Sequence, residues 1–424
     1  MTSQTTEPAF SPATGADMSP VSRQHDPILL LAAILISLVW VFDQGNGKVL
    51  QPGLVALLLI GALIALLAFR RWRYSPALTL GFTLLVTLSD RVPRTPYVGS
   101  DVMATTREAI AALFSGHDPY THVYLTSNPA GAPMPYLPGE TLFYAIPQLL
   151  FGRIQVADHW TGIGVVILLA ALAPLAGWGR SALLVAIYGA AGFTIQRSLD
   201  GSNDTSLAFL IILAVVLLAA SRATDGRTSA AMFWLSATFA AWALLFKELS
   251  WLVFMPLALG FRLWEPRWRA YLGVALGVPA LVLLAFFLWS PTGFMHNVGG
   301  GLTYHSGPSG LNLWALLYGL WPHASRFLLH AAPFLEAAVA LGLTGVAAPR
   351  PPGGLGAALL AGAGVLTAVL LVAGYSTGSY FALDFAVASA GVCLLGWDSR
   401  SGSHITSDAA PAGFEASGGF DRRM

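Results

Sequence analysis

The sequence predicts an all-α protein that crosses a membrane about 11–14 times. The first observation is composition: 55% of the 424 residues are hydrophobic and only 10% are charged, whereas soluble proteins carry about 25% charged residues. The second is a mean hydropathy of +0.66. The third is a series of apolar runs, many of them close to the roughly 20 residues that a helix needs to cross the hydrocarbon. A single soluble globule is therefore excluded, because polar side chains could not cover its surface.

The apolar runs give the order of the predicted spans. They occupy residues 27–42, 53–69, 76–89, 160–177, 181–195, 206–220, 230–246, 249–260, 270–289, 311–320, 327–347, 355–374 and 379–397. A shorter run at 141–151 is interpreted as a short or re-entrant piece. Residues 27–397 therefore form one transmembrane domain, and the polar tails at 1–26 and 398–424 are predicted to be disordered.

Charge and cysteine content exclude several functional classes. The net charge is +1, so nothing indicates a nucleic-acid partner. Cys393 is the single cysteine, which excludes a disulfide scaffold, an iron–sulfur centre and a thiolate zinc site. The histidines lack zinc-binding spacing, so neither a metal site nor a cofactor is expected. A divalent cation held by carboxylates would leave no such signature and stays open.

Arginine clusters orient the chain, because cytoplasmic loops carry an excess of basic residues. Such clusters lie in three tight turns, near residues 70–73, 222–227 and 262–269. If all three turns are cytoplasmic, the outer face carries segments 89–140, 196–205, 247–248 and 290–310.

The long polar loop 89–140 is predicted to carry structure of its own, because unstructured loops of this length are uncommon. Asp101 is a candidate N-cap for a helix that continues to about Phe114. Met103, Ile110, Leu113 and Phe114 lie on one side of this helix, which predicts that it lies along the membrane surface with Phe114 buried against lipid or other helices. Gly116 is predicted to end it.

The loop sequence "GSDVMATTREAIAALFSGHDPYTH", followed by "PYLPGETLFYAIP", resembles the first outer loop of the GT-C glycosyltransferases. It is most similar to the group that uses polyprenyl-phosphate sugars, including the polyprenol-phosphate-mannose-dependent mannosyltransferases. An acidic residue, a surface helix, a Gly-x-x-Pro-Tyr turn and a Tyr-x-Pro step occur in that family's order. The segments around Asn203 and Lys247 resemble outer helix edges of the same group, and the resemblance covers about residues 90–260. Two departures are an additional span before the loop and the absence of a glutamine before Asn203.

This resemblance implies a GT-C-like fold and a membrane hexosyltransferase of the cell envelope. Such an enzyme moves mannose, or another hexose or pentose, from a polyprenyl-phosphate carrier to a lipid or glycan acceptor at the outer face of the cell membrane. It would therefore contact membrane lipids as well as both substrates. The resemblance implies substrate contacts for Tyr120, Tyr136 and Asn203.

Sugar transfer from a lipid phosphate needs a base that takes a proton from the acceptor hydroxyl. Asp101 is the preferred candidate, because it carries the family match and begins the surface helix. Asp90 and Asp118 are the alternative bases, and a plain capping role for Asp101 stays open. Glu140, at the head of a segment, is interpreted as a helix-start charge favoured by the helix dipole.

Cations should meet the departing phosphate, and Lys247 is the most informative candidate. A charge between apolar runs is costly and indicates function, although a snorkelling lysine paired with Glu248 is the alternative. Capping of the helix after residue 205 is the preferred role of Asn203 or Asp204. His296 and His305 lie in a glycine-rich loop and are candidate phosphate or acceptor ligands.

A different class of function depends on acids inside the membrane. Asp384 is expected to bond to Ser379 or Tyr380 or to face a cavity. Together with Glu336 it would be central to a multi-pass transporter or lipid flippase. A non-catalytic scaffold protein is the third hypothesis. The long structured loop favours the enzyme, because an alternating-access carrier does not need one.

Overall fold

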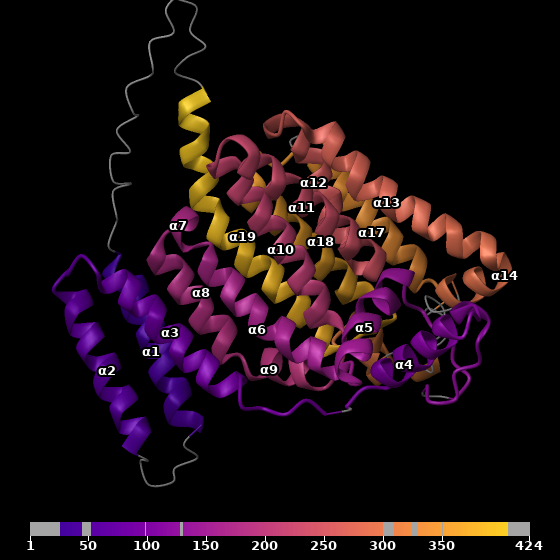
Figure 1. Ribbon diagram of the computed structural model, residues 1–424, viewed down its shortest axis with the longest axis horizontal. Helices are drawn as coiled ribbons and strands as arrows, with labels where there is room; N and C mark the ends of the chain where they lie inside the picture. Colours follow the sequence, from indigo (N-terminus) through magenta and orange to yellow (C-terminus); the bar gives the residue numbers. More distant parts are fainter. Residues whose placement is uncertain are drawn as a thin grey trace, which may run out of the picture.

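The computed structural model is a bundle of long helices with a smaller group of three helices at one side (Figure 1). It describes residues 26–44, 52–97, 99–127, 130–299, 309–323, 330–349 and 351–405. Most of the predicted tails lies outside these ranges. Within them the regular structure is helical, apart from one pair of two-residue strands. The all-α fold class is therefore confirmed.

The side group consists of α1 (Pro27–Gln44), α2 (Pro52–Phe69) and α3 (Ser75–Arg91), drawn in indigo in Figure 1. Ile34, Ile64, Phe82 and Val86 form a small buried cluster between these helices. Both α1 and α3 also pack against α8 (Trp178–Ala190), which joins the group to the main bundle.

The long loop carries the predicted surface helix, α4 (Asp101–Phe114). A 3-10 turn, η1 (Pro119–Thr121), and α5 (Pro138–Phe151) follow it. Gly116 has φ +75° just after α4, as expected of a glycine that ends a helix. Met103 and Ile110 are buried on the inner side, whereas Phe114 is 55% exposed. Within the described part of the chain Phe114 is therefore not buried by other helices, and its contact with lipid stays a prediction.

The rest of the chain forms the main bundle. Its elements are α6 (Gln155–Ala171), α7 (Ala173–Ala176), α8, α9 (Gly192–Leu199), α10 (Asp204–Ala223), α11 (Gly226–Phe246), α12 (Leu249–Trp264), α13 (Trp268–Trp289), α14 (Pro291–Phe294), η2 (Met295–Gly299), β1 (Ser309–Gly310), α15 (Leu313–Leu320), α17 (Ala332–Ala347), α18 (Leu355–Val372), β2 (Tyr375–Ser376) and α19 (Gly378–Ile405). Helix α19 continues past Trp397, where the sequence predicted the start of a disordered tail.

Among the described residues, six helices are long and apolar enough to cross a membrane. Helices α8 and α9 meet at a bend of 62° and together make a seventh if the bent pair is one span, so the run predicted to cross at 181–195 is not one continuous helix. Shorter apolar helices lie at Pro27–Trp40, Val55–Phe69, Leu249–Trp264 and Ala332–Ala347. The predicted run at 311–320 forms only the eight-residue α15, which is too short to cross. The chain is a multi-pass membrane protein.

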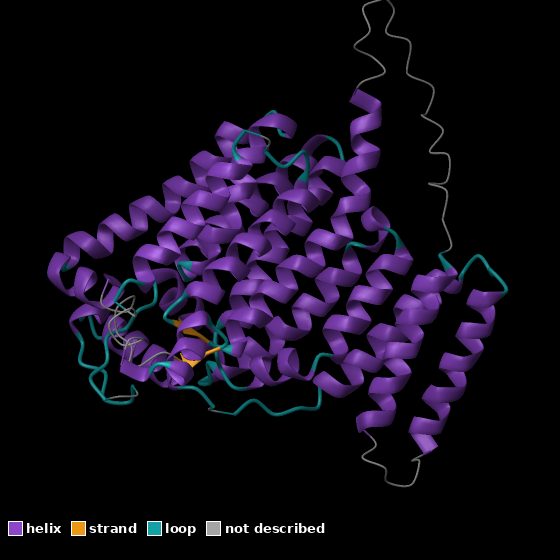
Figure 2. Ribbon diagram, turned by 180° about the vertical axis from the view of Figure 1, so that it is seen from behind, coloured by secondary structure: helices purple, strands orange, loops and turns teal. Residues whose placement is uncertain are grey.

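Two predicted arginine turns meet at one end of the bundle. The guanidinium of Arg222, at the end of α10, lies 5.0 Å from the ring of Trp264, at the end of α12, and 5.0 Å from the ring of Trp397 in α19. Helices α4, α5 and α9 lie at the opposite end, which is the lower end in Figure 1. Figure 2 shows the two strands among the loops at that same end. We call it the loop end.

Candidate functional site

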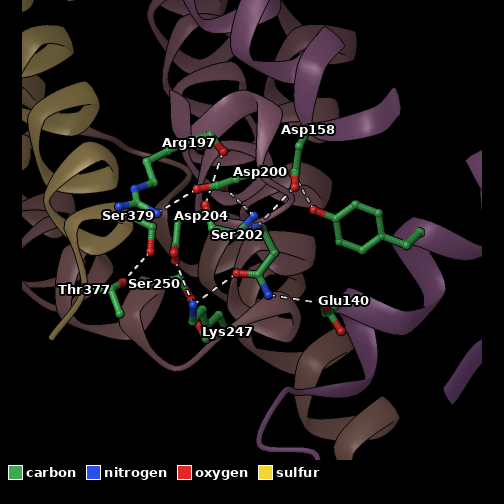
Figure 3. Close-up of polar contacts among 12 residues, drawn as sticks. Glu140, Asp158, Arg197, Asp200, Ser202, Asp204, Lys247, Ser250, Thr377 and Ser379 are labelled. Atoms are coloured by element: carbon green, nitrogen blue, oxygen red, sulfur yellow. Dashed lines mark hydrogen bonds and ion pairs between the residues drawn. The ribbon is translucent and has the colours of Figure 1, made fainter. Parts of the chain in front are cut away.

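The turn between α9 and α10 is the centre of the candidate site (Figure 3). Gly201 and Asn203 both have left-handed backbone, with φ of +75° and +61°. Asp200 holds the turn, because its carboxylate accepts hydrogen bonds from the Ser202 amide at 3.1 Å and from Arg197 at 2.7 Å. Asn203 occupies the N-cap position of α10, but its side chain makes no capping bond. The predicted capping role is therefore wrong for Asn203.

Lys247 lies where α11 ends, and its ammonium group enters this turn. Its Nζ donates to Asp204 Oδ1 at 2.8 Å and to Asn203 Oδ1 at 3.1 Å. The residue is only 2% exposed. The alternative of a snorkelling lysine whose partner is Glu248 is wrong, because the ion pair is with Asp204. Asp204 is the first residue of α10 and not its N-cap, so the predicted capping role is wrong for Asp204 as well.

The charge of Lys247 is maintained in spite of its burial. Burial lowers the pKa of Lys247, but the carboxylate of Asp204 opposes this and the pKa is raised overall. The ammonium also lies 4.4 Å from the ring centre of Tyr380 and 5.5 Å from that of Tyr136, where aromatic faces attract cations. Lys247 is thus a buried, compensated cation at the loop end.

Glu140 joins the network from the first turn of α5. It is fully buried, and its Oε1 accepts hydrogen bonds from Thr106 of α4 at 2.7 Å and from Asn203 at 3.2 Å. Its Oε2 is buried without a hydrogen-bond partner. Burial raises the pKa of Glu140 to about 7, although both hydrogen bonds and the charge of Lys247 oppose the shift. The interpretation of Glu140 as a helix-start charge is correct about its position in the first turn of α5. It does not include the hydrogen bonds with Thr106 and Asn203.

A close backbone approach brings Glu140 to the network. A Cβ atom at the preceding residue, Gly139, would lie 2.5–2.6 Å from Leu245 atoms, including its backbone carbonyl. Only glycine therefore allows the start of α5 to touch the end of α11. The glycine in the "LPGE" segment is the sequence signal that could have indicated this contact.

Asp158 of α6 is a second buried acid that sequence reasoning missed. It accepts hydrogen bonds from the hydroxyls of Tyr144 and Ser206, both at 2.5 Å, and from the backbone amide of Asn203 at 3.2 Å. These bonds tie α5, α6 and α10 to the turn (Figure 3). Asp158 therefore fixes the unusual backbone of Asn203.

Asp101, the candidate base, is exposed at the start of α4. The N-cap is Ser100, whose hydroxyl accepts from the Val102 amide, so Asp101 is the first helical residue and its predicted capping role is wrong. Helix α4 packs on the central turn, because Met103 fills the space in front of Gly201.

An electrostatic relation links Asp101 to the lysine. Burial raises the pKa of Tyr375, in β2, and the charge of Asp101 raises it further, whereas Lys247 lowers it. The charges of Asp101 and Lys247 therefore act on the same phenol in opposite directions.

The two tyrosines predicted to contact substrate are structural neighbours. Tyr120 is buried, and its hydroxyl donates to the backbone carbonyl of Tyr136 at 2.8 Å. Asn297 in η2 fixes both ends of this segment, accepting from the Met134 amide and donating to the Tyr120 carbonyl, each at 2.6 Å. Of the two tyrosines, Tyr136 is the one whose ring lies near the ammonium group of Lys247.

Both alternative bases are engaged elsewhere. Asp90 pairs with Arg94 one helical turn later, at 2.7 Å. Asp118 caps η1 by accepting from the Tyr120 amide at 3.0 Å. Among the described residues neither forms a hydrogen bond with the network around Lys247.

The histidine candidates give no ligand cluster. His296 is exposed in η2, and His305 lies outside the described residues. His122 contacts Glu108 at 3.3 Å. Among the described residues no three histidine, cysteine, aspartate or glutamate side chains are grouped to hold a metal ion.

The two membrane acids proposed for a transporter lie among the later helices. Asp384 accepts a hydrogen bond from Thr367 of α18, so the expected partners Ser379 and Tyr380 are wrong. Glu336 accepts from the Gly374 amide at 3.2 Å. Each acid has a local structural partner, and neither forms a hydrogen bond with the network around Lys247.

The fold and the site define a polytopic helical membrane protein with a buried polar network under a loop-borne helix. No family model matches the chain, and no curated protein matches it. Two solved structures are similar to it: ArnT from Cupriavidus metallidurans bound to undecaprenyl phosphate, and the same protein in the apo state. The first is 16% identical, with a TM-score of 0.49, over 75% of this chain and 59% of that one. The second is 16% identical, with a TM-score of 0.47, over 77% and 61%.

The chain thus spans about three-fifths of the length of these structures. At this identity and TM-score, the likeness does not establish a family or an activity for the chain.

Proposed function

We propose that the protein is a membrane glycosyltransferase that moves a sugar from a polyprenyl-phosphate carrier to an acceptor hydroxyl. One observation carries the proposal. The loop motifs that resemble the GT-C family, from Asp101 to Glu140, fold directly over a buried network built on Lys247. A lysine enclosed between apolar helices is costly and indicates function.

In the proposed reaction the acceptor oxygen attacks the anomeric carbon of the sugar. The bond from that carbon to the phosphate oxygen breaks, and the lipid phosphate leaves with the bonding electrons. Asp101 takes the proton of the acceptor hydroxyl. Its exposed position at the start of α4 suits this role, because a general base must reach the proton that it abstracts.

Positive charge near the departing phosphate would stabilise the leaving group. Lys247 already donates hydrogen bonds to Asp204 and Asn203. In this proposal it therefore lies at the bottom of the donor site and attracts the phosphate electrostatically, without a direct contact. Arg197 is the more accessible cation, with a side chain that is 31% exposed. A divalent cation bound through the phosphate stays compatible with this arrangement.

The finer assignments belong to the same proposal. Mannose is the preferred sugar, the acceptor is a lipid or glycan, and the loop end faces the outside of the cell membrane. The first two follow from the sequence resemblance, and the third follows from the arginine turns at the opposite end.

The experiment is a transfer assay with purified protein, a radiolabelled polyprenyl-phosphate mannose and a lipid extract as acceptor. Asp101→Asn keeps the size of the residue but removes the proton acceptor, so the rate should fall about 10²–10⁴-fold with unchanged thermal stability. Asp384→Asn is the matched control and should keep the rate. Wild-type transfer by Asp101→Asn would refute the base. Absence of transfer by the wild-type protein would refute the glycosyltransferase proposal.

A further inference from the structure

A pocket of about 430 Å³ lies on the side of α4 that faces away from the buried network. It is lined by Pro96, Tyr97, Arg107, Gln148, Gly152, Arg153 and Gln155. These residues come from the segment before α4, from α4 itself, from the end of α5, from the turn that follows it and from the start of α6. Thr106 points inward to Glu140, whereas its neighbour Arg107 is exposed and lines the pocket.

The lining of this pocket is cationic and has no acidic side chain. Arg107 and Arg153 take no part in the ion pairs of the described residues. Unpaired guanidinium groups facing one pocket suit a phosphate group, which they bind through charge-assisted hydrogen bonds. The carbonyl oxygen of Gln148 is buried without a donor, so a ligand hydroxyl would satisfy it.

The pocket borders an exposed apolar surface. Directly after Gln148, the side chains of Leu149, Leu150 and Phe151 are 69%, 68% and 63% exposed, and Trp160 in α6 is 54% exposed. In a multi-pass membrane protein such a surface contacts acyl chains, and a tryptophan marks the membrane interface. The polar lining and the apolar surface thus match the head and tail of one amphipathic molecule.

We infer that this pocket binds the head group of a phosphate-bearing lipid whose head also carries hydroxyl groups, with its acyl chains along the end of α5. Arg107 and Arg153 bind the phosphate, and Gln148 accepts from a hydroxyl. The inference rests on the pocket and does not depend on the proposed sugar transfer.

The test is equilibrium binding of the full-length purified protein to fluorophore-labelled phosphatidylglycerol in detergent, measured by fluorescence anisotropy. The double variant Arg107→Gln/Arg153→Gln should bind at least about tenfold more weakly, since a hydrogen bond to a charged group contributes about 1.5–3 kcal/mol. Arg227→Gln, at an exposed arginine near the opposite end, should change the affinity less than about twofold.

Two further measurements test the ligand chemistry. Gln148→Leu should weaken binding of phosphatidylglycerol but not of phosphatidic acid, which lacks the head-group hydroxyls. Unlabelled diacylglycerol, which has no phosphate, should not displace the labelled phosphatidylglycerol. A thermal melt checks folding, which should persist because both arginines are exposed.

Unchanged affinity of the folded double variant would overturn the site. Full displacement of the lipid by millimolar inorganic phosphate would show a small-anion site and overturn the lipid assignment. An equal loss with Arg227→Gln would show non-specific attraction of anionic lipid to the protein and would also overturn the proposal.

Discussion

At the scale of single residues, the ion pair of Lys247 and Asp204 is the most consequential contact. Both side chains are nearly inaccessible, at 3% and 1% exposure. Removing one partner of a buried pair leaves an uncompensated charge, which typically costs about 3–5 kcal/mol. The pair therefore constrains the fold as strongly as it constrains the site.

Lys247→Met should lower the unfolding temperature sharply, because the Asp204 carboxylate stays buried without its cation. The double variant Lys247→Met/Asp204→Asn should recover much of the loss, since no buried charge remains. Lys247→Arg should recover part of it, because the charge is kept although the geometry differs. Thermal unfolding in detergent measures all three. Equal melting temperatures for the single and double variants would contradict the pairing.

The raised pKa of Glu140 predicts how the free energy of unfolding depends on pH. The folded protein raises its pKa from 4.5 to about 7, so the folded state binds this proton more tightly than the unfolded state. The stabilisation is complete below about pH 4.5 and is lost as the pH rises through about 7. Glu140→Gln should therefore flatten the decline of the melting temperature across this window.

The control for Glu140 is Asp225→Asn, an exposed acid beside an arginine turn at the opposite end. It should leave the pH profile as in the wild type. A Glu140→Gln profile that is as steep as that of the wild type would show that another group titrates in this window.

At the scale of elements, the packing of α4 on the central turn decides where the candidate base lies. Gly201 has φ +75°, and a Cβ atom there would lie 2.3 Å from Met103 Cγ. Gly116 has the same φ of +75° but nothing within 4 Å of its Cβ position. Comparing substitutions at the two glycines therefore separates the stability cost of left-handed backbone from the cost of disturbed packing between α4 and the central turn.

Gly116→Ala should cost only the left-handed backbone penalty, about 1–2 kcal/mol. Gly201→Ala should cost more, because it also pushes α4 away from the turn. Adding Met103→Ala should restore part of the stability to Gly201→Ala and none to Gly116→Ala. Calorimetry of the four proteins tests this, and identical losses at the two glycines would mean that α4 does not pack as described.

At the scale of the whole molecule, the ends of the bundle differ in charge and in structure. One end holds arginine turns near Trp264 and Trp397, and the other holds α4, α5 and the buried network. Positive charge on cytoplasmic loops would place the loop end outside.

A reporter fused in residues 223–228 should therefore read cytoplasmic, and one in residues 124–132 should read external. The pair of fusions is its own control, because each reports one end of the bundle. Both reporters on the same side would overturn the membrane topology, and with it the outer-face site.

The sequence by itself determined the membrane class, most of the helices and the loop helix from Asp101 to Phe114. The physical reason is that these features depend on local quantities: the length of apolar runs, a helix period of 3.6 residues and a glycine at the end. It also indicated Lys247, because a charge inside an apolar run is visible in the chain alone.

Only the tertiary structure decided which groups Lys247, Glu140 and Asp158 meet. Local patterns offered a phosphate group or, as the alternative, Glu248 as the partner of the lysine, and they predicted a dipole role for Glu140. Long-range packing instead brings residues 140, 158, 203 and 247 together. Asn203, at the left-handed turn that follows the bent pair α8 and α9, contacts each of the other three. These are contacts between distant segments, which the periodicity of a sequence does not encode.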